Sequence, residues 1–326
     1  MTDGVVLRMV ETNGIRVRVA EAGSGPLVLL CHGFPESWYS WRHQLRALAA
    51  AGYHAVAPDG RGYGGSDAPW PIEQYTIMHL VGDLVGLLDA LGEQRAVIVG
   101  HDWGAIVAWN AALLRPDRFY AVANLSVPYT PRGDLRPLEA FARAAGGRFH
   151  YILYFQQPGR AEAELGRDTR RTLRSVLYSA SGDPPPQERY RGDLPATAGW
   201  LDALTDPPRL PAWLSESDLD YFAAEFERAG WRGPLNWYRN FDRNWELLAP
   251  WKNAPVTVPA LFVAGKEDGV IRMAGGALAA MPRTVPNLRG TILLDGCGHW
   301  TQQERPEEVN RALLQFLAAV VERATP

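Results

Sequence analysis

One segment decides the fold: Val97-Ile98-Val99-Gly100-His101-Asp102-Trp103-Gly104-Ala105, in which an apolar run, a tight turn and an apolar helical stretch follow one another. Glycines on both sides of the turn leave room for a strained backbone, so the Asp102 side chain projects alone. This strand–turn–helix pattern is typical of a nucleophile elbow and predicts that Asp102 is the nucleophile. The alternative is a helix N-cap, because aspartate is favoured there.

The same alternation of short apolar runs and helical stretches continues along the chain, which is typical of an α/β fold with a mostly parallel central sheet and flanking helices. Two segments that alternate in polarity, 5–11 and 15–20, flank Thr12-Asn13-Gly14 and predict an antiparallel hairpin at a sheet edge. Further strands are expected at 27–31, 55–57, 96–99, 122–125, 261–264 and 291–294. Helices are expected at 41–50, 77–91, 105–114, 274–280 and 306–322.

The middle of the chain departs from this alternation. From residue 129 to residue 257 the sequence becomes aromatic, Arg-rich and Pro-rich, with helical character at 135–146, 160–178 and 217–230. We therefore predict a core formed by residues 1–128 and 258–326. Residues 129–257 are expected to form an inserted helical cap over the carboxyl ends of the strands.

Composition excludes several classes of protein. The 326 residues are 47% hydrophobic and 21% charged, as in ordinary globular proteins, and the net charge of -3 with no basic stripe argues against a nucleic-acid partner. No apolar run approaches about 18 residues, so no membrane association is expected. The two cysteines, Cys31 and Cys297, and an N-terminus without a signal-peptide pattern favour a cytoplasmic location.

An aspartate at the elbow has a chemical consequence. A carboxylate that attacks a saturated carbon forms an ester, and water can then hydrolyse that ester at its carbonyl. The tetrahedral oxyanion of the second step needs hydrogen-bond donors. The backbone N–H groups of Trp103 and of Phe34, in His32-Gly33-Phe34-Pro35-Glu36, are the candidates, although Gly33-Phe34-Pro35 alone also fits a simple turn.

A general base and its orienting carboxylate are expected after the last two strands. Leu294-Asp295-Gly296-Cys297-Gly298-His299-Trp300 places His299 in a glycine-lined loop, and Val263-Ala264-Gly265-Lys266-Glu267-Asp268 supplies Asp268. The order nucleophile, acid, histidine is met. Glu267 is the neighbouring alternative to Asp268, but we expect it to point elsewhere. The remaining histidines are expected to be structural.

Together these motifs resemble the soluble epoxide hydrolases of the α/β-hydrolase superfamily, over nearly the whole chain. The elbow, the Phe34 turn and the His299 loop are shared with dehalogenases. Two cap segments are more specific, Tyr154-Phe155-Gln156-Gln157-Pro158-Gly159 and Gly233-Pro234-Leu235-Asn236-Trp237-Tyr238-Arg239-Asn240, since they resemble those that supply the ring-opening tyrosines. The resemblance therefore implies that Tyr154 and Tyr238 are the ring-opening tyrosines. A phenol can donate a hydrogen bond and then a proton to an oxygen that departs as an alkoxide. A departing halide needs neither.

The expected activity is the hydrolysis of small aryl or alkyl epoxides to vicinal diols. Water is the co-substrate, no metal or organic cofactor is needed, and the protein is expected to be a monomer or homodimer. Phe34, Trp38 and Trp103 are expected to form apolar walls of the substrate site. One alternative is a haloalkane dehalogenase, which would use the same elbow; a haloacid dehalogenase would be expected to carry arginine where Trp103 stands. The other is a non-catalytic ligand-binding protein on the same fold.

Overall fold

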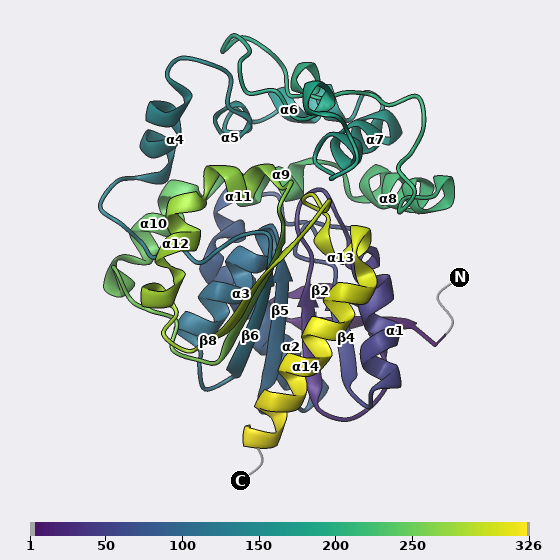
Figure 1. Ribbon diagram of the computed structural model, residues 1–326, viewed down its shortest axis with the longest axis vertical. Helices are drawn as coiled ribbons and strands as arrows, with labels where there is room; N and C mark the ends of the chain where they lie inside the picture. Colours follow the sequence, from purple (N-terminus) through teal and green to yellow (C-terminus); the bar gives the residue numbers. More distant parts are fainter. Residues whose placement is uncertain (1–3, 325–326) are drawn as a thin grey trace.

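An eight-stranded, mostly parallel sheet is the centre of the computed structural model, which describes residues 4–324 (Figure 1). The strand order is β1-β2-β4-β3-β5-β6-β7-β8. The strands are β1 (Val6–Thr12), β2 (Ile15–Ala22), β3 (Leu27–Cys31), β4 (His54–Pro58), β5 (Ala96–His101), β6 (Phe119–Leu125), β7 (Ala260–Gly265) and β8 (Leu288–Leu294). Every predicted strand is present, and the predicted fold class is confirmed.

The first two strands form the predicted hairpin. β1 lies at the edge of the sheet and pairs antiparallel with β2, which in turn pairs antiparallel with β4. Asn13 and Gly14 connect β1 to β2 with φ angles of 45° and 77°, the left-handed backbone that a tight hairpin turn requires. All other neighbouring strands are parallel, so their carboxyl ends meet at one edge.

Helices cover both faces of the sheet. One face carries α1 (Arg42–Ala50) and α14 (Pro306–Ala324), and the other carries α2 (Ile77–Leu91) and α3 (Trp103–Leu114). In β3, Val28 and Leu30 pack on the α1 side while Leu29 packs on the α2 side, because side chains alternate along a strand. Both faces being covered explains why the central strands are continuously apolar.

Helices and loops that connect β6 to β7 lie over the carboxyl ends of the strands (Figure 1). In the described chain no strand of the sheet falls within this connection. Its helices are α4 (Pro137–Ala145), α5 (Tyr151–Tyr154), α6 (Arg160–Leu165), α7 (Thr169–Ser179), α8 (Glu216–Ala229), α9 (Arg232–Arg239) and α10 (Phe241–Leu247). We refer to this connection as the cap; the division of the chain at residues 129 and 257 stays a prediction.

The structure divides one predicted helix into two. The stretch 160–178 breaks after Leu165, and α7 begins again beyond Asp168, whose side chain accepts a hydrogen bond from Arg171 N at 2.9 Å. An aspartate at a helix start stabilises the new N-terminus by this bond.

Short elements complete the architecture. The remaining helices are α11 (Gly269–Met273), α12 (Gly275–Thr284) and α13 (Thr301–Glu304). Short 3-10 turns lie at Trp38–Trp41, Ile72–Tyr75, Pro186–Glu188, Leu201–Ala203 and Ala249–Trp251. Across residues 4–324, none of the helices combines the length and the apolar character needed to cross a membrane.

Candidate active site

The candidate site lies where the strand order reverses. β4 lies beyond β3 on one side, and β6 lies beyond β5 on the other, so the loops that follow β3 and β5 diverge and leave a crevice at the carboxyl edge. Phe34 follows β3 and Asp102 follows β5. The topology therefore brings the predicted oxyanion donor and the predicted nucleophile to the same crevice.

The turn at Asp102 has the strained geometry of a nucleophile elbow. Asp102 has φ 50° and ψ −117°, a backbone conformation that residues other than glycine rarely adopt. A Cβ at Gly104 would lie 2.0 Å from the Cys31 oxygen, and one at Gly100 would lie 2.3 Å from the Gly104 oxygen. Only glycine fits at these two positions, so the sequence is matched to the turn.

The Asp102 carboxylate faces the crevice. Its Oδ1 accepts a hydrogen bond from Phe34 N at 2.8 Å, and its Oδ2 lies 3.5 Å from His299 Nε2. The N-cap alternative is wrong, because the carboxylate turns to these groups rather than to the first turn of α3. The N–H of Trp103 is at the first residue of α3, where a helix leaves its N–H without an intrahelical acceptor.

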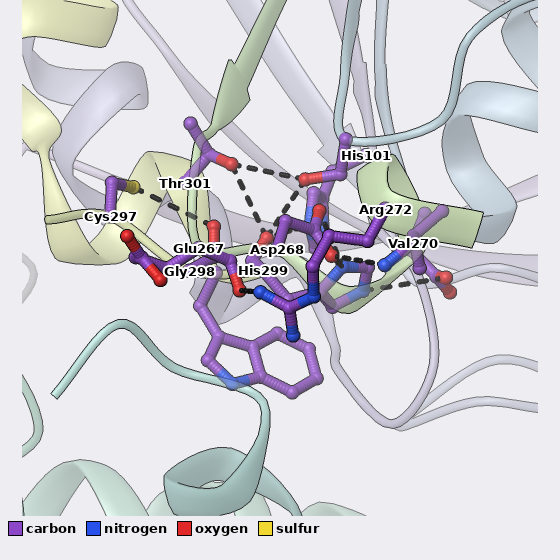
Figure 2. A network of polar contacts seen from close by, with 12 residues as sticks. His101, Glu267, Asp268, Val270, Arg272, Cys297, Gly298, His299 and Thr301 are labelled. Carbon is purple, nitrogen blue, oxygen red and sulfur yellow. Dashed lines mark hydrogen bonds and ion pairs between the residues drawn. The ribbon is translucent and has the colours of Figure 1, made fainter. Parts of the chain in front are cut away.

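His299 is held between two carboxylates. Its Nδ1 lies 3.1 Å from Asp268 Oδ2 and 3.2 Å from Asp268 Oδ1, and Val270 N donates to Asp268 at 2.8 Å (Figure 2). Glu267 instead pairs with Arg189 of the cap, so it points away from His299. Asp102, His299 and Asp268 therefore form one continuous chain of polar contacts.

The surroundings of His299 and Asp102 favour the charged form of both side chains. Burial alone would lower the pKa of His299, but the charges of Asp268 and Asp102 outweigh it and hold the pKa well above its ordinary value. Burial alone would likewise raise the pKa of Asp102, yet its contact with His299 keeps it below the ordinary value. These shifts favour a protonated His299 beside an ionised Asp102 carboxylate.

A buried polar network behind the elbow was not predicted. The fully buried Glu36 carboxylate accepts hydrogen bonds from Gly33 N at 2.9 Å and lies 2.8 Å from His101 Nδ1, while His101 Nε2 donates to the His299 carbonyl at 2.7 Å. The side-chain amides of Gln302 and Gln303 also donate to the Glu36 carboxylate. The network joins the loop after β3, the elbow and the His299 loop. Its sequence signal was a glutamate in a turn next to a buried strand.

Tyr238 lies at the site as predicted from the resemblance. It is on α9 and is 4% exposed, with its ring 5.2 Å from Phe34 and 5.1 Å from Trp103, centroid to centroid. Burial raises the pKa of its phenol well above the ordinary value, and the charge of Asp102 adds to the rise. The Tyr238 phenol therefore stays protonated and can donate a hydrogen bond near Asp102.

The other predicted tyrosine lies elsewhere. The Tyr154 hydroxyl donates to Glu164 at 2.8 Å, and Arg160 stacks over its ring at 4.5 Å. Tyr151, one turn earlier on α5, instead packs against Tyr238 with ring centroids 6.0 Å apart. Burial and then the charge of Asp102 raise the Tyr151 pKa above its ordinary value. The structure thus replaces Tyr154 by Tyr151 as the partner of Tyr238.

Of the three predicted wall residues, two lie at the site. Phe34 and Trp103 both pack on Tyr238, whereas Trp38 belongs to the cluster on the α1 face and donates from its indole to Tyr221 of the cap at 2.9 Å. Trp38 therefore joins the core to the cap, because the short turn Trp38–Trp41 lies against α8. Trp200 was missed: it packs against Phe34 at 5.7 Å and stacks on Tyr151 at 6.0 Å.

Comparisons with known proteins agree with this geometry. The family model of the alpha/beta hydrolase fold matches residues 26–306. The chain is 52% identical to epoxide hydrolase A of Mycobacterium tuberculosis over 318 residues, covering 96% of this chain and 97% of that protein. It is 44% identical to an epoxide hydrolase of Caballeronia sordidicola, covering 98% and 96% of the two chains.

Solved structures give the same assignment. An epoxide hydrolase from an endophytic Streptomyces superposes with a TM-score of 0.95 at 52% identity, covering 98% of this chain and 97% of the other. Epoxide hydrolase A from Mycobacterium thermoresistibile superposes with a TM-score of 0.91 at 52% identity, covering 96% and 98%. The chain belongs to the epoxide hydrolases of the α/β-hydrolase fold.

Proposed function

We propose that this epoxide hydrolase converts small aryl or alkyl epoxides to vicinal diols through a covalent ester on Asp102. The observation that carries the proposal is the arrangement of Asp102 between Phe34 N and His299, with Asp268 behind the histidine. A carboxylate held in this way can act as a nucleophile first and as an electrophile afterwards. The aromatic side chains around it favour apolar substrates.

In the first step, the phenols of Tyr151 and Tyr238 hold the epoxide oxygen. An Asp102 oxygen attacks the less hindered carbon from the opposite side, the carbon–oxygen bond of the ring breaks, and its electron pair stays on the departing oxygen. One phenol transfers its proton to that oxygen. Their raised pKa values keep both phenols protonated before the reaction.

In the second step, ester formation removes the negative charge of Asp102. The pKa of His299 then falls, because one of the two charges that raised it is gone, and the imidazolium passes its proton on to the phenolate left by the first step. Neutral His299 takes a proton from water, which attacks the Asp102 carboxyl carbon while the N–H groups of Phe34 and Trp103 stabilise the oxyanion. Collapse of this intermediate restores the Asp102 carboxylate and releases the diol, whose oxygen takes the remaining proton of the attacking water, while His299 keeps the proton that it took and is again an imidazolium.

An isotope experiment tests the covalent route. With enzyme in excess over styrene oxide in H₂¹⁸O, the label is expected in the Asp102 carboxyl and not in the first diol released, because water attacks the protein carboxyl. Mass spectrometry of the diol and of the peptide that contains Asp102 measures both. Label in the first diol would mean that water attacks the epoxide directly.

A pair of tyrosine variants tests the assignment on α5. Tyr151→Phe is expected to lower kcat/KM for styrene oxide about 10²-fold, because a proton donor to the departing oxygen is lost. Tyr154→Phe is the matched control three residues away, and it is expected to change kcat/KM less than about threefold, because only its bond to Glu164 is lost. Steady-state diol formation measures both, and the reverse order of effects would restore Tyr154 to the site.

The dehalogenase and binding-protein alternatives are less well supported. The relatives named above are epoxide hydrolases, and the two protonated phenols near Asp102 suit an alkoxide rather than a halide. Bromide release from 1-bromobutane would favour the first alternative. A cytoplasmic monomer or homodimer completes the proposal, and the free, buried thiols of Cys31 and Cys297 suit a reducing compartment.

A further inference from the structure

The loop that carries His299 is docked on the cap as well as on the core. His299 N donates to the Ala180 carbonyl at 2.8 Å, and the Trp300 indole donates to the Leu177 carbonyl at 2.7 Å. A Cβ at Gly298 would lie 2.2 Å from the Ser181 carbonyl carbon. The end of α7 and the residues after it therefore contact the loop so closely that movement of one displaces the other.

One carboxylate joins the two sides of this contact. Glu304, at the end of α13, accepts hydrogen bonds from Gly298 N at 2.8 Å and from Trp300 N at 2.9 Å, the residues before and after His299. The oxygen that accepts from Gly298 also accepts from Gly182 N of the cap at 2.9 Å. The backbone on both sides of the histidine is thus held by the same side chain that holds the cap.

The surroundings of Glu304 are unfavourable for its charge. Burial raises the pKa of Glu304 to about 7 even though the three N–H groups lower it, and nearby Asp183 adds to the rise. A carboxyl whose folded pKa lies above its unfolded value loses stabilisation as the pH rises through the folded pKa. Ionised Glu304 is therefore less stabilising above neutral pH than protonated Glu304 is at lower pH.

We propose that Glu304 is a positioning residue that couples the seating of the cap to the orientation of His299 for ester hydrolysis. This inference rests on the proposed role of His299 as general base. The His299 Nε2 reaches the Asp102 side chain only at 3.5 Å, so a small shift of its backbone changes the approach of water to the ester. The alkylation step uses Asp102 and the phenols, which Glu304 does not contact.

Glu304→Gln is the test, because its amide NH₂ replaces one oxygen that accepts a backbone N–H. Ester hydrolysis is expected to slow about 10- to 100-fold while alkylation keeps its rate. In a two-step reaction kcat and KM then fall together and kcat/KM is unchanged, and the Asp102 ester accumulates during turnover. Glu307→Gln, on the exposed first turn of α14, is the matched control and is expected to leave kcat and KM unchanged.

Stopped-flow fluorescence and quenched-sample mass spectrometry with styrene oxide measure the two steps. Hydrolysis at the wild-type rate in Glu304→Gln would overturn the inference, as would equal losses in kcat and kcat/KM, which indicate general damage. If Glu304→Gln shows no cooperative unfolding and so does not fold, Glu304→Asp takes its place. This variant keeps the charge and is expected to have a lower kcat than the wild type at constant kcat/KM. The proposed function is tested separately, because His299→Gln must trap the ester whatever Glu304 does.

Discussion

Asp102→Ala is expected to abolish epoxide turnover, with a fall in kcat of at least about 10⁴-fold, because no other side chain can form the ester. The same variant is expected to gain no mass when it is quenched after incubation with styrene oxide. Chiral chromatography of the diol and intact-protein mass spectrometry provide the two measurements. The loss is chemical rather than structural, since the carboxylate does not cap α3.

Two further variants separate chemistry from folding. Asp295→Ala, an exposed aspartate on the His299 loop, is the matched control and is expected to retain activity within about twofold. Asp102→Gly is expected to be inactive but to unfold at a higher temperature than Asp102→Ala, because glycine adopts a φ of 50° without strain. Turnover that survives in Asp102→Ala would exclude the covalent mechanism.

His299→Gln is expected to separate the two halves of the reaction. Ring opening by Asp102 continues, whereas ester hydrolysis loses its general base and slows about 10²- to 10⁴-fold. The quenched protein is then expected to carry the mass of one epoxide on the peptide that contains Asp102. A burst of epoxide consumption, equal to the enzyme concentration, should precede the slow phase.

The control for this variant is a histidine on a helix of the core. His43→Gln on α1 is expected to turn over at nearly the wild-type rate and to show no accumulated adduct. If His299→Gln consumed no epoxide at all, the histidine would be required for alkylation. If it turned over normally, another group would be the base, and the inference about Glu304 would lose its foundation.

The sequence predicts the core better than the cap, for a physical reason. Strands buried on both faces form continuous apolar runs, so β3, β5 and β7 are evident from composition alone. The cap is built from helices as short as α5 and α6, and four to six residues are too few to display a helical period. The break before α7 was visible in principle, since Gly166 and Asp168 are a typical stop and start.

The site was predictable where one loop decides the position of a side chain. Asp102 directly follows β5, and Asp268 and His299 lie in the loops after β7 and β8, so the topology brings them to the same edge of the sheet. Tyr151 and Tyr154 lie on one short helix, and only the fold of α6, which presents Glu164 to Tyr154, determines which phenol faces the nucleophile. The prediction that Trp38 forms a wall of the site was wrong for the same reason, because α8 supplies the surroundings of Trp38.

The connection between β6 and β7 has an evolutionary consequence. The two strands are neighbours in the sheet, so the polypeptide leaves and re-enters the sheet at adjacent positions. A segment exchanged at that point alters no pairing register, and His299 keeps its place as long as the new segment preserves the contacts that Ala180 and Gly182 make with the His299 loop. Selection can therefore vary the aromatic surroundings of Asp102 through this one connection without disturbing the sheet, while the few cap residues that touch the His299 loop stay constrained.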